Sequence, residues 1–295
     1  MKGLILAGGS GSRLYPITRS VNKQLLPIYN KPMIYYPLTT LMLGGVRDIM
    51  IITNPAERAA FENLLGDGSR WGLTLSYVAQ TRPGGLPEAF IYGAEFIGGS
   101  GCVLILGDNV YFGQGLSHML HTAITANQGM TAFGYRVTDP QNFGVVEFDA
   151  AGKVVSLEEK PAKPRSSYAV TGLYICDAEV VNIARGLKPS ARGELEIIDV
   201  LKHYLARGRL TVNNFGRGIA WLDTGSPHGL LQAAQFVESV ETRQGVMIAC
   251  PEEIAYRRGY IDRAQLLSLA EDLSKTGYGA YLRQIADEAP STLPI

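Results

Sequence analysis

The chain opens with residues 2–14, KGLILAGGSGSRL, in which a short apolar run leads directly into a glycine-rich segment. The apolar run at residues 4–6 is typical of a buried strand, and glycines let backbone N–H groups approach phosphate oxygens without interference from Cβ atoms. Arg13-Leu14 replaces the Lys-Ser/Thr of a Walker A loop, and Leu14 stands where a dinucleotide fingerprint has its third glycine. The stretch therefore predicts a strand followed by a phosphate-binding turn of another type, although a tight turn without a ligand would look similar.

Four more apolar runs follow in the first half of the chain, at residues 49–53, 73–78, 103–106 and 131–135. They are continuous rather than alternating, which is the pattern of strands buried on both faces of a sheet. Helices are expected between them, near residues 87–88 and over 116–127. The clearest helix start has Asn54 as N-cap, Pro55 at the first helical position and Glu57 closing a capping box. This alternation predicts an α/β fold with a doubly wound, mostly parallel, Rossmann-like sheet.

The second half of the chain has a different pattern. Residues 145–148 and 154–158 flank a turn at 149–152, which predicts a small antiparallel insertion. Further strands are predicted at residues 168–175 and 210–215, and helices at 195–206, 230–241, 263–270 and 278–286. We expect one main domain over residues 1–241 and a helical C-terminal subdomain over residues 242–295.

Composition excludes several classes of function. The 295 residues carry 27 basic and 27 acidic side chains, so no global field draws the chain to nucleic acid or to anionic lipid. The three cysteines form no CxxC pair and are expected to pack in the core rather than to build disulfides or a zinc site. No stretch approaches the ~18 apolar residues of a membrane span, and a cytoplasmic location is expected.

The glycine-rich segment continues into a longer series of motifs: GGSGSRLYPIT at residues 8–18, KQLLP at 23–27 and KPM at 31–33. This series resembles the signature of the sugar-phosphate nucleotidyltransferases, GGxGxRLxPxT followed by K, LLP and KPM. The resemblance implies that Arg13 and Lys23 are catalytic, because nucleotidyl transfer places negative charge on phosphates that cations can stabilise. It also implies a nucleotide site made by Gly8, Gly9, Gly11, Ser12, Arg13, Gln24, Gln80 and Gly85.

Two aspartates follow short apolar runs in distant parts of the chain. Asp108 comes after residues 103–106, at the carboxyl end of a predicted strand, where open α/β sheets bind ligands. Asp223 comes after the run at 220–222, and either aspartate alone could equally cap a turn. The resemblance implies that both hold Mg²⁺, because the family takes its metal ligands from GDN-type and WxDxG-type segments. Asp108 is therefore expected to be catalytic as well, and Mg²⁺ accepts two carboxylates plus substrate phosphates.

Three further motifs match the part of the family that binds the sugar phosphate: SLEEKP at 156–161, VTGLY at 170–174 and KPSARGELE at 188–196. The expected contacts are Asn109, Gly144, Glu159, Lys160, Val170 and Arg192. For Glu159 and Lys160, the alternative is an ordinary surface ion pair. The resemblance thus implies a nucleotide-binding half over about 1–110 and a sugar-phosphate-binding half over about 111–241.

The resemblance also implies the reaction. Glucose 1-phosphate attacks the α-phosphorus of dTTP in line, without a covalent intermediate, and dTDP-glucose and pyrophosphate are released into the synthesis of dTDP-sugars such as dTDP-rhamnose. Gln80 would read the base, with Gly85 and Gln24 nearby, because an amide can both donate to and accept from thymine. Ser12, Phe143 and Pro87-Glu88 depart from the usual Thr, Tyr and Ala-Gln. The last two departures leave UTP or a modified sugar 1-phosphate as alternative substrates.

A segment near the C-terminus matches a regulatory region of the family. It runs CPEEIAYR over residues 250–257, and its relatives help to form a second nucleotide site between subunits. The resemblance therefore implies a possible regulatory site at Cys250, Glu253, Ile254 and Arg257, feedback by a dTDP-sugar, and a homotetramer.

Two other classes of function remain as alternatives. An NAD-dependent oxidoreductase would suit the same sheet and glycine loop, but the chain lacks the GxGxxG spacing and an acidic residue at Thr53-Asn54 for the ribose. An inactive regulatory relative should have lost Arg13, Lys23, Asp108 or Asp223, and all four are present.

Overall fold

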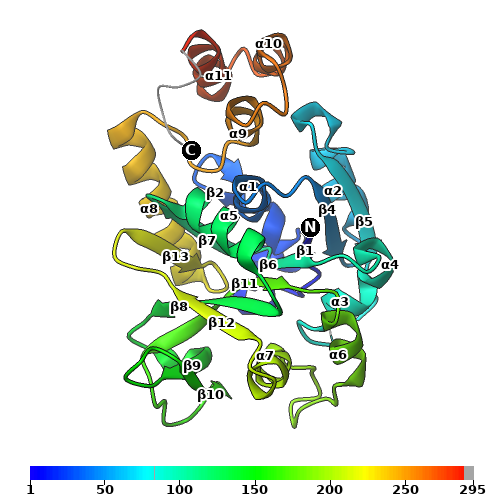
Figure 1. Ribbon diagram of the computed structural model, residues 1–295. Coiled ribbons are helices and arrows are strands. Elements are labelled where there is room, and N and C mark those ends of the chain that lie inside the picture. Colours follow the sequence, from blue (N-terminus) through cyan, green and yellow to red (C-terminus); the bar gives the residue numbers. More distant parts are fainter. Residues whose placement is uncertain (83, 289–295) are drawn as a thin grey trace.

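The computed structural model describes residues 1–82 and 84–288, and a nine-stranded mixed sheet forms its centre (Figure 1). Four strands run parallel in the order β6–β1–β4–β5: Cys102–Leu106, Lys2–Ala7, Asp48–Thr53 and Thr74–Ala79. Because these strands run parallel, their carboxyl ends lie at one edge of the sheet, and the chain passes to both sides of β1 there. The predicted doubly wound α/β fold is confirmed.

The antiparallel part of the sheet joins β6 through the long strand β11 (Tyr168–Cys176). The first residues of β11 pair with β9 (Gly144–Phe148), which forms the predicted hairpin with β10 (Val154–Glu159), and its last residues pair with β6. Between these partners, at residues 170–172, the pairing on this edge is interrupted, which is where the candidate site lies. The remaining strands of the sheet, on the other edge of β11, are β8 (Met130–Arg136) and β12 (Leu210–Asn214).

Both faces of the parallel strands are buried. Ile5 packs on one face with residues of α1 (Tyr35–Leu43) and α5 (Leu116–Ala126), whereas its neighbour Leu4 packs on the other face with residues of α3 (Glu88–Tyr92). Successive side chains of a strand point to opposite faces, so a sheet covered on both sides requires apolar residues without alternation. The other helices of this region are α2 (Arg58–Leu65), α4 (Ala94–Ile97), α6 (Val180–Gly186) and α7 (Ile197–Ala206).

Two helix starts differ from the sequence prediction. Helix α2 begins at Arg58 and not at Pro55, so the predicted first turn is wrong. Asn54 does accept a hydrogen bond from the Glu57 N–H at 3.0 Å, but the Glu57 carboxylate accepts from the side chains of Asn54 and Asn22. Glu57 therefore links a turn to the glycine-rich region instead of closing a capping box.

Helix α1 was missed because its sequence, YYPLTTLML, combines aromatic, β-branched and proline residues that favour helix weakly. Its two threonines donate side-chain hydrogen bonds to carbonyls of the preceding turn, Thr39 to Tyr35 and Thr40 to Tyr36, both at 2.8 Å. Tertiary packing of its buried residues holds the helix.

A second, two-stranded sheet was not predicted either. It pairs β7 (Asn109–Gly113) with β13 (Ile219–Asp223) in antiparallel register, and α8 (Pro227–Gln244) follows directly after β13. A two-stranded hairpin of β2 (Pro27–Ile28) and β3 (Lys31–Pro32) lies near the end of α8. Strands β7 and β13 come from distant parts of the chain, and no local pattern indicates their pairing.

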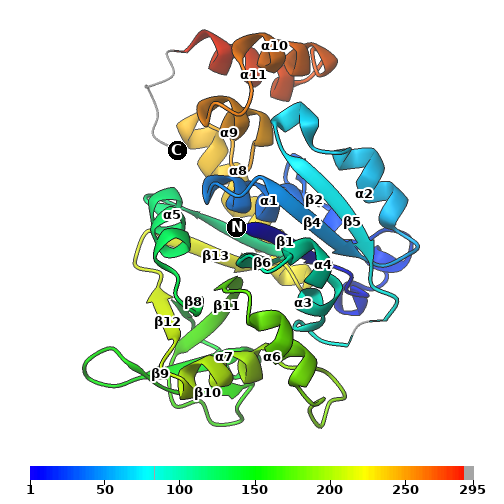
Figure 2. The same ribbon diagram turned by 45° about the vertical axis from the view of Figure 1, so that its right-hand side comes forward.

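The C-terminal helices lie together at one end of the molecule in both views (Figures 1 and 2). They are α9 (Pro251–Arg257), which was not predicted, α10 (Arg263–Asp272) and α11 (Gly277–Asp287). Their buried residues, such as Ile254 and Leu282, belong to the same hydrophobic cluster as Leu38 of α1. The three cysteines are free and buried, as predicted. In the described residues, no helix is both long and apolar enough to cross a membrane.

Candidate active site

A cleft of about 220 Å³ opens at the interruption in the pairing of β11. Val170 and Gly172 of that interruption line it, together with Phe143 before the β9–β10 hairpin and Trp221 of β13. Nine of the predicted site residues share this lining: Arg13, Asp108, Asn109, Gly144, Glu159, Lys160, Val170, Arg192 and Asp223. The fold thus brings together residues predicted for catalysis, metal binding and sugar-phosphate binding from positions spread between Arg13 and Asp223.

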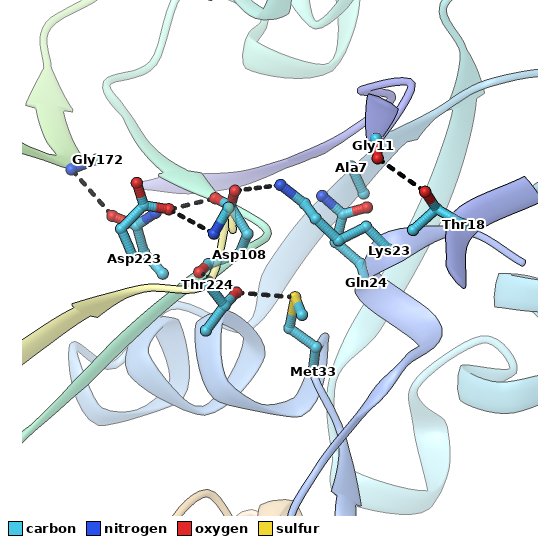
Figure 3. A network of polar contacts seen from close by, with 12 residues as sticks. Ala7, Gly11, Thr18, Lys23, Gln24, Met33, Asp108, Gly172, Asp223 and Thr224 are labelled. Atoms are coloured by element: carbon cyan, nitrogen blue, oxygen red, sulfur yellow. Dashed lines mark hydrogen bonds and ion pairs between the residues drawn. The ribbon is translucent and has the colours of Figure 1, made fainter. Parts of the chain in front are cut away.

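Pairing of β7 with β13 explains why the two aspartates meet. Asn109 is directly opposite Asp223 in the register, so Asp108 precedes one strand where Asp223 ends the other. Thr224, which follows β13, holds the ends of the two strands together. Its N–H and its hydroxyl donate to the backbone carbonyl of Asp108, at 3.2 and 2.7 Å (Figure 3). The two carboxylates, more than a hundred residues apart in sequence, therefore reach the same end of one small sheet.

Asn109 organises the floor of the cleft and is almost fully buried. Its Nδ2 donates to Asp108 Oδ1 at 2.9 Å. Its Oδ1 accepts from the indole of Trp221 at 2.7 Å and from the Gly172 N–H at 3.2 Å. These contacts make Asn109 a positioning residue for Asp108, for Trp221 and for the interrupted edge of β11. Its predicted contact with the sugar phosphate stays a prediction.

Lys23 approaches Asp108 from the opposite side. It lies in a 3₁₀ turn at Lys23–Leu25, capped by Asn22, whose side chain accepts from the Gln24 N–H at 2.8 Å and donates to the Ala7 carbonyl at 3.1 Å. These bonds attach the turn to the end of β1, and the Lys23 ammonium forms an ion pair with Asp108 Oδ2 (Figure 3).

Arg13 is placed by the glycine-rich loop. The loop turns at Gly11, whose φ of 62° favours glycine, and Thr18 closes it by donating to the Gly11 carbonyl at 2.7 Å. Arg13 is exposed and reaches across Gly225, where an added Cβ would lie 2.6 Å from its guanidinium and 2.9 Å from Asp223 Oδ1. A glycine at position 225 thus allows the Arg13 guanidinium and the Asp223 carboxylate to approach each other.

The two aspartates differ in electrostatic environment. Burial disfavours the charged form of Asp108, but the charge and hydrogen bond of Lys23 outweigh it and lower the pKa of Asp108. Burial and then the negative charge of Asp108 raise the pKa of Asp223, which only partly benefits from Lys23 and Arg13. Lys23 therefore neutralises most of the charge of Asp108, whereas the charge of Asp223 is neutralised only in part. A cation placed between the two carboxylates would relieve the excess negative charge.

Asp223→Asn is expected to stabilise the metal-free protein at pH 7. Because the pKa of Asp223 is higher in the folded than in the unfolded protein, its stability contribution falls as pH rises from about 4 through the folded pKa. The amide removes this dependence and still accepts the hydrogen bond of the Gly225 N–H. Urea unfolding in EDTA between pH 4 and 8 measures the effect, with Asp108→Asn as the variant expected to change stability in the opposite direction. A destabilised Asp223→Asn protein at pH 7 would contradict the expectation.

Ion pairs link the residues that were predicted to bind the sugar phosphate. Arg192 bonds to Glu196 at 2.7 Å and to Glu159 at 3.2 Å, and the Lys160 ammonium lies 3.9 Å from Glu159. Burial, followed by the charge of Glu196, raises the pKa of Glu159. Two carboxylates thus hold the Arg192 guanidinium. The sequence reasoning missed Glu196, although it lies within the KPSARGELE motif.

Apart from Arg13, the residues predicted to bind the nucleotide are not among those that line this cleft, and most follow the carboxyl ends of the parallel strands. Gly8, Gly9, Gly11 and Ser12 follow β1, and Gln80 follows β5. Gln24 packs beside Gly107, after β6, and its Oε1 is buried without a partner among the described residues. Gly85, with φ of 109°, pairs with Leu195 so closely that a Cβ would clash.

The residues predicted for a regulatory site are buried around α9. Cys250, Glu253 and Ile254 are at most 8% exposed, and burial raises the pKa of the Cys250 thiol. Arg257 bonds to Glu253 at 2.8 Å and to Glu288 at 2.9 Å. In the single chain these four side chains contact their own helical subdomain, and their regulatory role stays a prediction.

Comparison with known proteins agrees with this geometry. The chain belongs to the nucleotidyl transferase family, whose model matches residues 2–240, and the predicted family is confirmed. It is a nucleotidyltransferase, which excludes the oxidoreductase alternative. Members of this family generally use a divalent metal.

Individual relatives within this family carry more specific names. The chain is 54% identical over 285 residues, 97% of each chain, to the glucose-1-phosphate thymidylyltransferase of Xanthomonas campestris pv. campestris (strain B100). It is 56% identical to the enzyme of that name from Neisseria gonorrhoeae, over 96% of this chain and 98% of the relative. A crystal structure of a putative glucose-1-phosphate thymidylyltransferase from Bacillus anthracis, in complex with a sucrose, matches with a TM-score of 0.74 and 41% identity, over 80% of this chain and 94% of that one. UDP-glucose pyrophosphorylase complexed with UDP-glucose matches with a TM-score of 0.71 and 26% identity, over 81% and 98%.

Proposed function

We propose that this chain transfers the thymidylyl group of dTTP to glucose 1-phosphate, giving dTDP-glucose and pyrophosphate. The names of its relatives at 51–56% identity support this reaction. The observation that carries it is the junction of β7 and β13, which brings Asp108 and Asp223 to one end of the cleft. Lys23 pairs with Asp108 there, and Arg13 also lines the cleft.

Charge stabilisation is the main task of the chain in this reaction. Arg13 is exposed and lines the cleft, so its guanidinium can fork onto phosphate oxygens, and Lys23 offers a point charge beside Asp108. Arg192 would exchange its carboxylate partners for the phosphate of the sugar. The attacking phosphate oxygen is already an anion near neutral pH, so the site needs no general base and no covalent intermediate.

Asp108 and Asp223 are the residues that would hold Mg²⁺. In residues 1–82 and 84–288, no three His, Cys, Asp or Glu side chains converge on a metal site, so the two carboxylates would share the ion with substrate oxygens. The raised pKa of Asp223 fits this set, because it reflects negative charge that lacks a counter-ion. When bound, the ion neutralises phosphate charge and orients the attack.

The residues at the carboxyl ends of β1, β5 and β6 would recognise the base. Gln80 would read the base, with Gln24 and the backbone of Gly85 nearby. Gln24 Oε1 is buried and has no hydrogen-bond partner in residues 1–82 and 84–288. Because such atoms are rare in proteins, it supports the proposal that a ligand binds beside Gln24. UTP is the second candidate, since the chain also shares its fold with a UDP-glucose pyrophosphorylase.

Pyrophosphate release tests the proposal directly. With Mg²⁺ and glucose 1-phosphate, we expect turnover with dTTP to exceed that with ATP, GTP and CTP, and turnover to stop when EDTA removes the metal. Turnover with UTP alone would keep the reaction class and overturn the base assignment. No pyrophosphate with any of the five triphosphates would contradict the proposed reaction and favour the inactive relative.

We also propose that the chain forms a homotetramer, and analytical ultracentrifugation would measure this oligomeric state. We further propose a boundary between subdomains near residue 241 and a cytoplasmic location. The regulatory site at Cys250, Glu253, Ile254 and Arg257 predicts inhibition by dTDP-rhamnose. Unchanged initial rates at saturating dTDP-rhamnose would remove that proposal.

A further inference from the structure

Glu57, a half-buried acidic residue just before helix α2, bonds to the turn that carries Lys23. Its carboxylate oxygen Oε2 accepts from the side-chain Nδ2 atoms of Asn22 and Asn54. Asn22 immediately precedes the Lys23 turn, and Asn54 immediately follows β4. The Glu57 N–H donates in return to Asn54 Oδ1 at 3.0 Å, which attaches Glu57 to the end of that strand. The carboxylate thus joins the end of β4 to the turn.

The Asn22 side chain is held in one orientation. It is 3% exposed, and its Nδ2 donates to the Ala7 carbonyl at 3.1 Å as well as to Glu57. Its Oδ1 accepts from the Gln24 N–H at 2.8 Å. A carbonyl and an ionised carboxylate only accept hydrogen bonds, so Ala7 and Glu57 together direct Nδ2 toward themselves and leave Oδ1 facing the turn. Glu57 is the charged and therefore the stronger of these two acceptors.

Asn22 in turn determines where Lys23 lies. Its side chain caps the turn at the Gln24 N–H, and its carbonyl accepts from the Leu25 N–H at 3.0 Å. From this turn the Lys23 ammonium reaches Asp108, which lines the cleft. Movement of the cap therefore moves the backbone that carries Lys23. A displacement of about 1 Å, even one caused far from the reacting atoms, can lower a reaction rate about a hundredfold.

We propose that Glu57 is a positioning residue for the reaction and that it acts on Lys23 through Asn22. This proposal rests on the proposed function, in which Lys23 stabilises the charge of the phosphates. Glu57 is not among the residues that line the cleft, so its loss should leave the binding of substrates largely intact. The ammonium acts on charge that develops in the transition state, so a displaced Lys23 lowers kcat more than it raises KM.

The test measures kcat, and KM for dTTP and glucose 1-phosphate, in the wild-type protein, Glu57→Met and Glu57→Gln. Glu57→Met removes the acceptor and should lower kcat about tenfold, the factor expected for one hydrogen bond to a charged group. Both KM values should stay within about threefold of the wild-type values. Glu57→Gln keeps an acceptor oxygen and should restore most of the lost kcat. Glu62→Met is the matched control, because it makes the same substitution on α2, where Glu62 is 40% exposed and pairs with Arg58. Its kcat should equal that of the wild-type protein.

A double-mutant cycle with Asn22→Ala separates positioning from a purely structural role. Because Asn22→Ala already breaks the connection, adding Glu57→Met should lower kcat by less than about threefold more. An undiminished tenfold loss in that background would show that Glu57 acts by another route and would overturn the proposal. So would a loss confined to KM or to the free energy of unfolding in urea. Glu57→Ala serves where Glu57→Met does not fold. Wild-type protein that releases no pyrophosphate with any triphosphate would instead contradict the proposed function.

Discussion

Replacing Asp108 with Asn is expected to lower kcat by about a hundredfold to a thousandfold, the range seen when a preorganised electrostatic group is removed from an active site. Asp108 is ion-paired with Lys23 and faces the cleft beside Asp223. The amide would weaken the proposed binding of the metal, and it leaves the Lys23 ammonium, whose side chain is 10% exposed, without its counter-ion. Pyrophosphate release at saturating dTTP and glucose 1-phosphate measures the loss.

Two further variants test whether the loss of activity is specific to the proposed metal ligands. Asp223→Asn should show a loss of similar size, because both carboxylates are proposed to hold one ion. Asp48→Asn is the matched control: Asp48 starts β4, at the opposite end of the sheet, and forms a half-exposed ion pair with Lys2. Its activity should remain that of the wild-type protein. Turnover of Asp108→Asn within about threefold of the wild-type value would remove Asp108 from the mechanism.

Replacing Lys31 with Met is expected to lower the free energy of unfolding by about 3–5 kcal/mol, the usual cost of removing one partner of a buried ion pair. The Lys31 ammonium lies 2.6 Å from Glu241, and their side chains are 1% and 7% exposed. Asn30 and the Ile248 N–H also donate to the Glu241 carboxylate, at 2.7 and 2.8 Å. The variant leaves this carboxylate buried without a cation, at the junction of the β2–β3 hairpin and the end of α8.

Urea denaturation measures this change against an exposed pair. Arg58 and Glu62 form an ion pair on the surface of α2, with side chains 47% and 40% exposed, so Arg58→Met should cost about 0.5 kcal/mol or less. The double variant Lys31→Met/Glu241→Leu should recover much of the lost stability, because it removes both buried charges. A loss below about 1 kcal/mol for Lys31→Met alone would show that water or other donors compensate Glu241.

This ion pair also assigns a role to part of the sequence signature. The motifs that indicated the family include KPM at residues 31–33, to which the sequence alone assigned no role. The structure buries Lys31 against Glu241, and the Thr224 hydroxyl next to Asp108 contacts Met33. Residues 31–33 therefore stabilise the candidate site indirectly, through Thr224, which bonds to the Asp108 carbonyl. Spacing alone could not separate such a role from the role of Lys23.

Features that depend on local pattern could be predicted from the sequence. Continuous apolar runs indicated strands buried on both faces, and the motif series from Gly8 to Met33 indicated the family. The start of α2 and the whole of α1 could not be predicted, because they depend on contacts outside the local sequence. Glu57 bonds to Asn22, far along the chain, and α1 forms from residues with weak helix propensity because packing outweighs that preference. Tertiary contacts decided both.

Only the tertiary structure decided how the site is assembled. The register that sets Asp223 beside Asp108, the Asn109 contacts that hold the floor of the cleft, and the bond between Asn22 and Glu57 all join separate segments. Periodicity reports which face of a strand or helix is buried, and a motif reports residue types at a spacing. Neither reports which donor meets which acceptor across the fold, because that depends on the positions of strands and helices once they have packed.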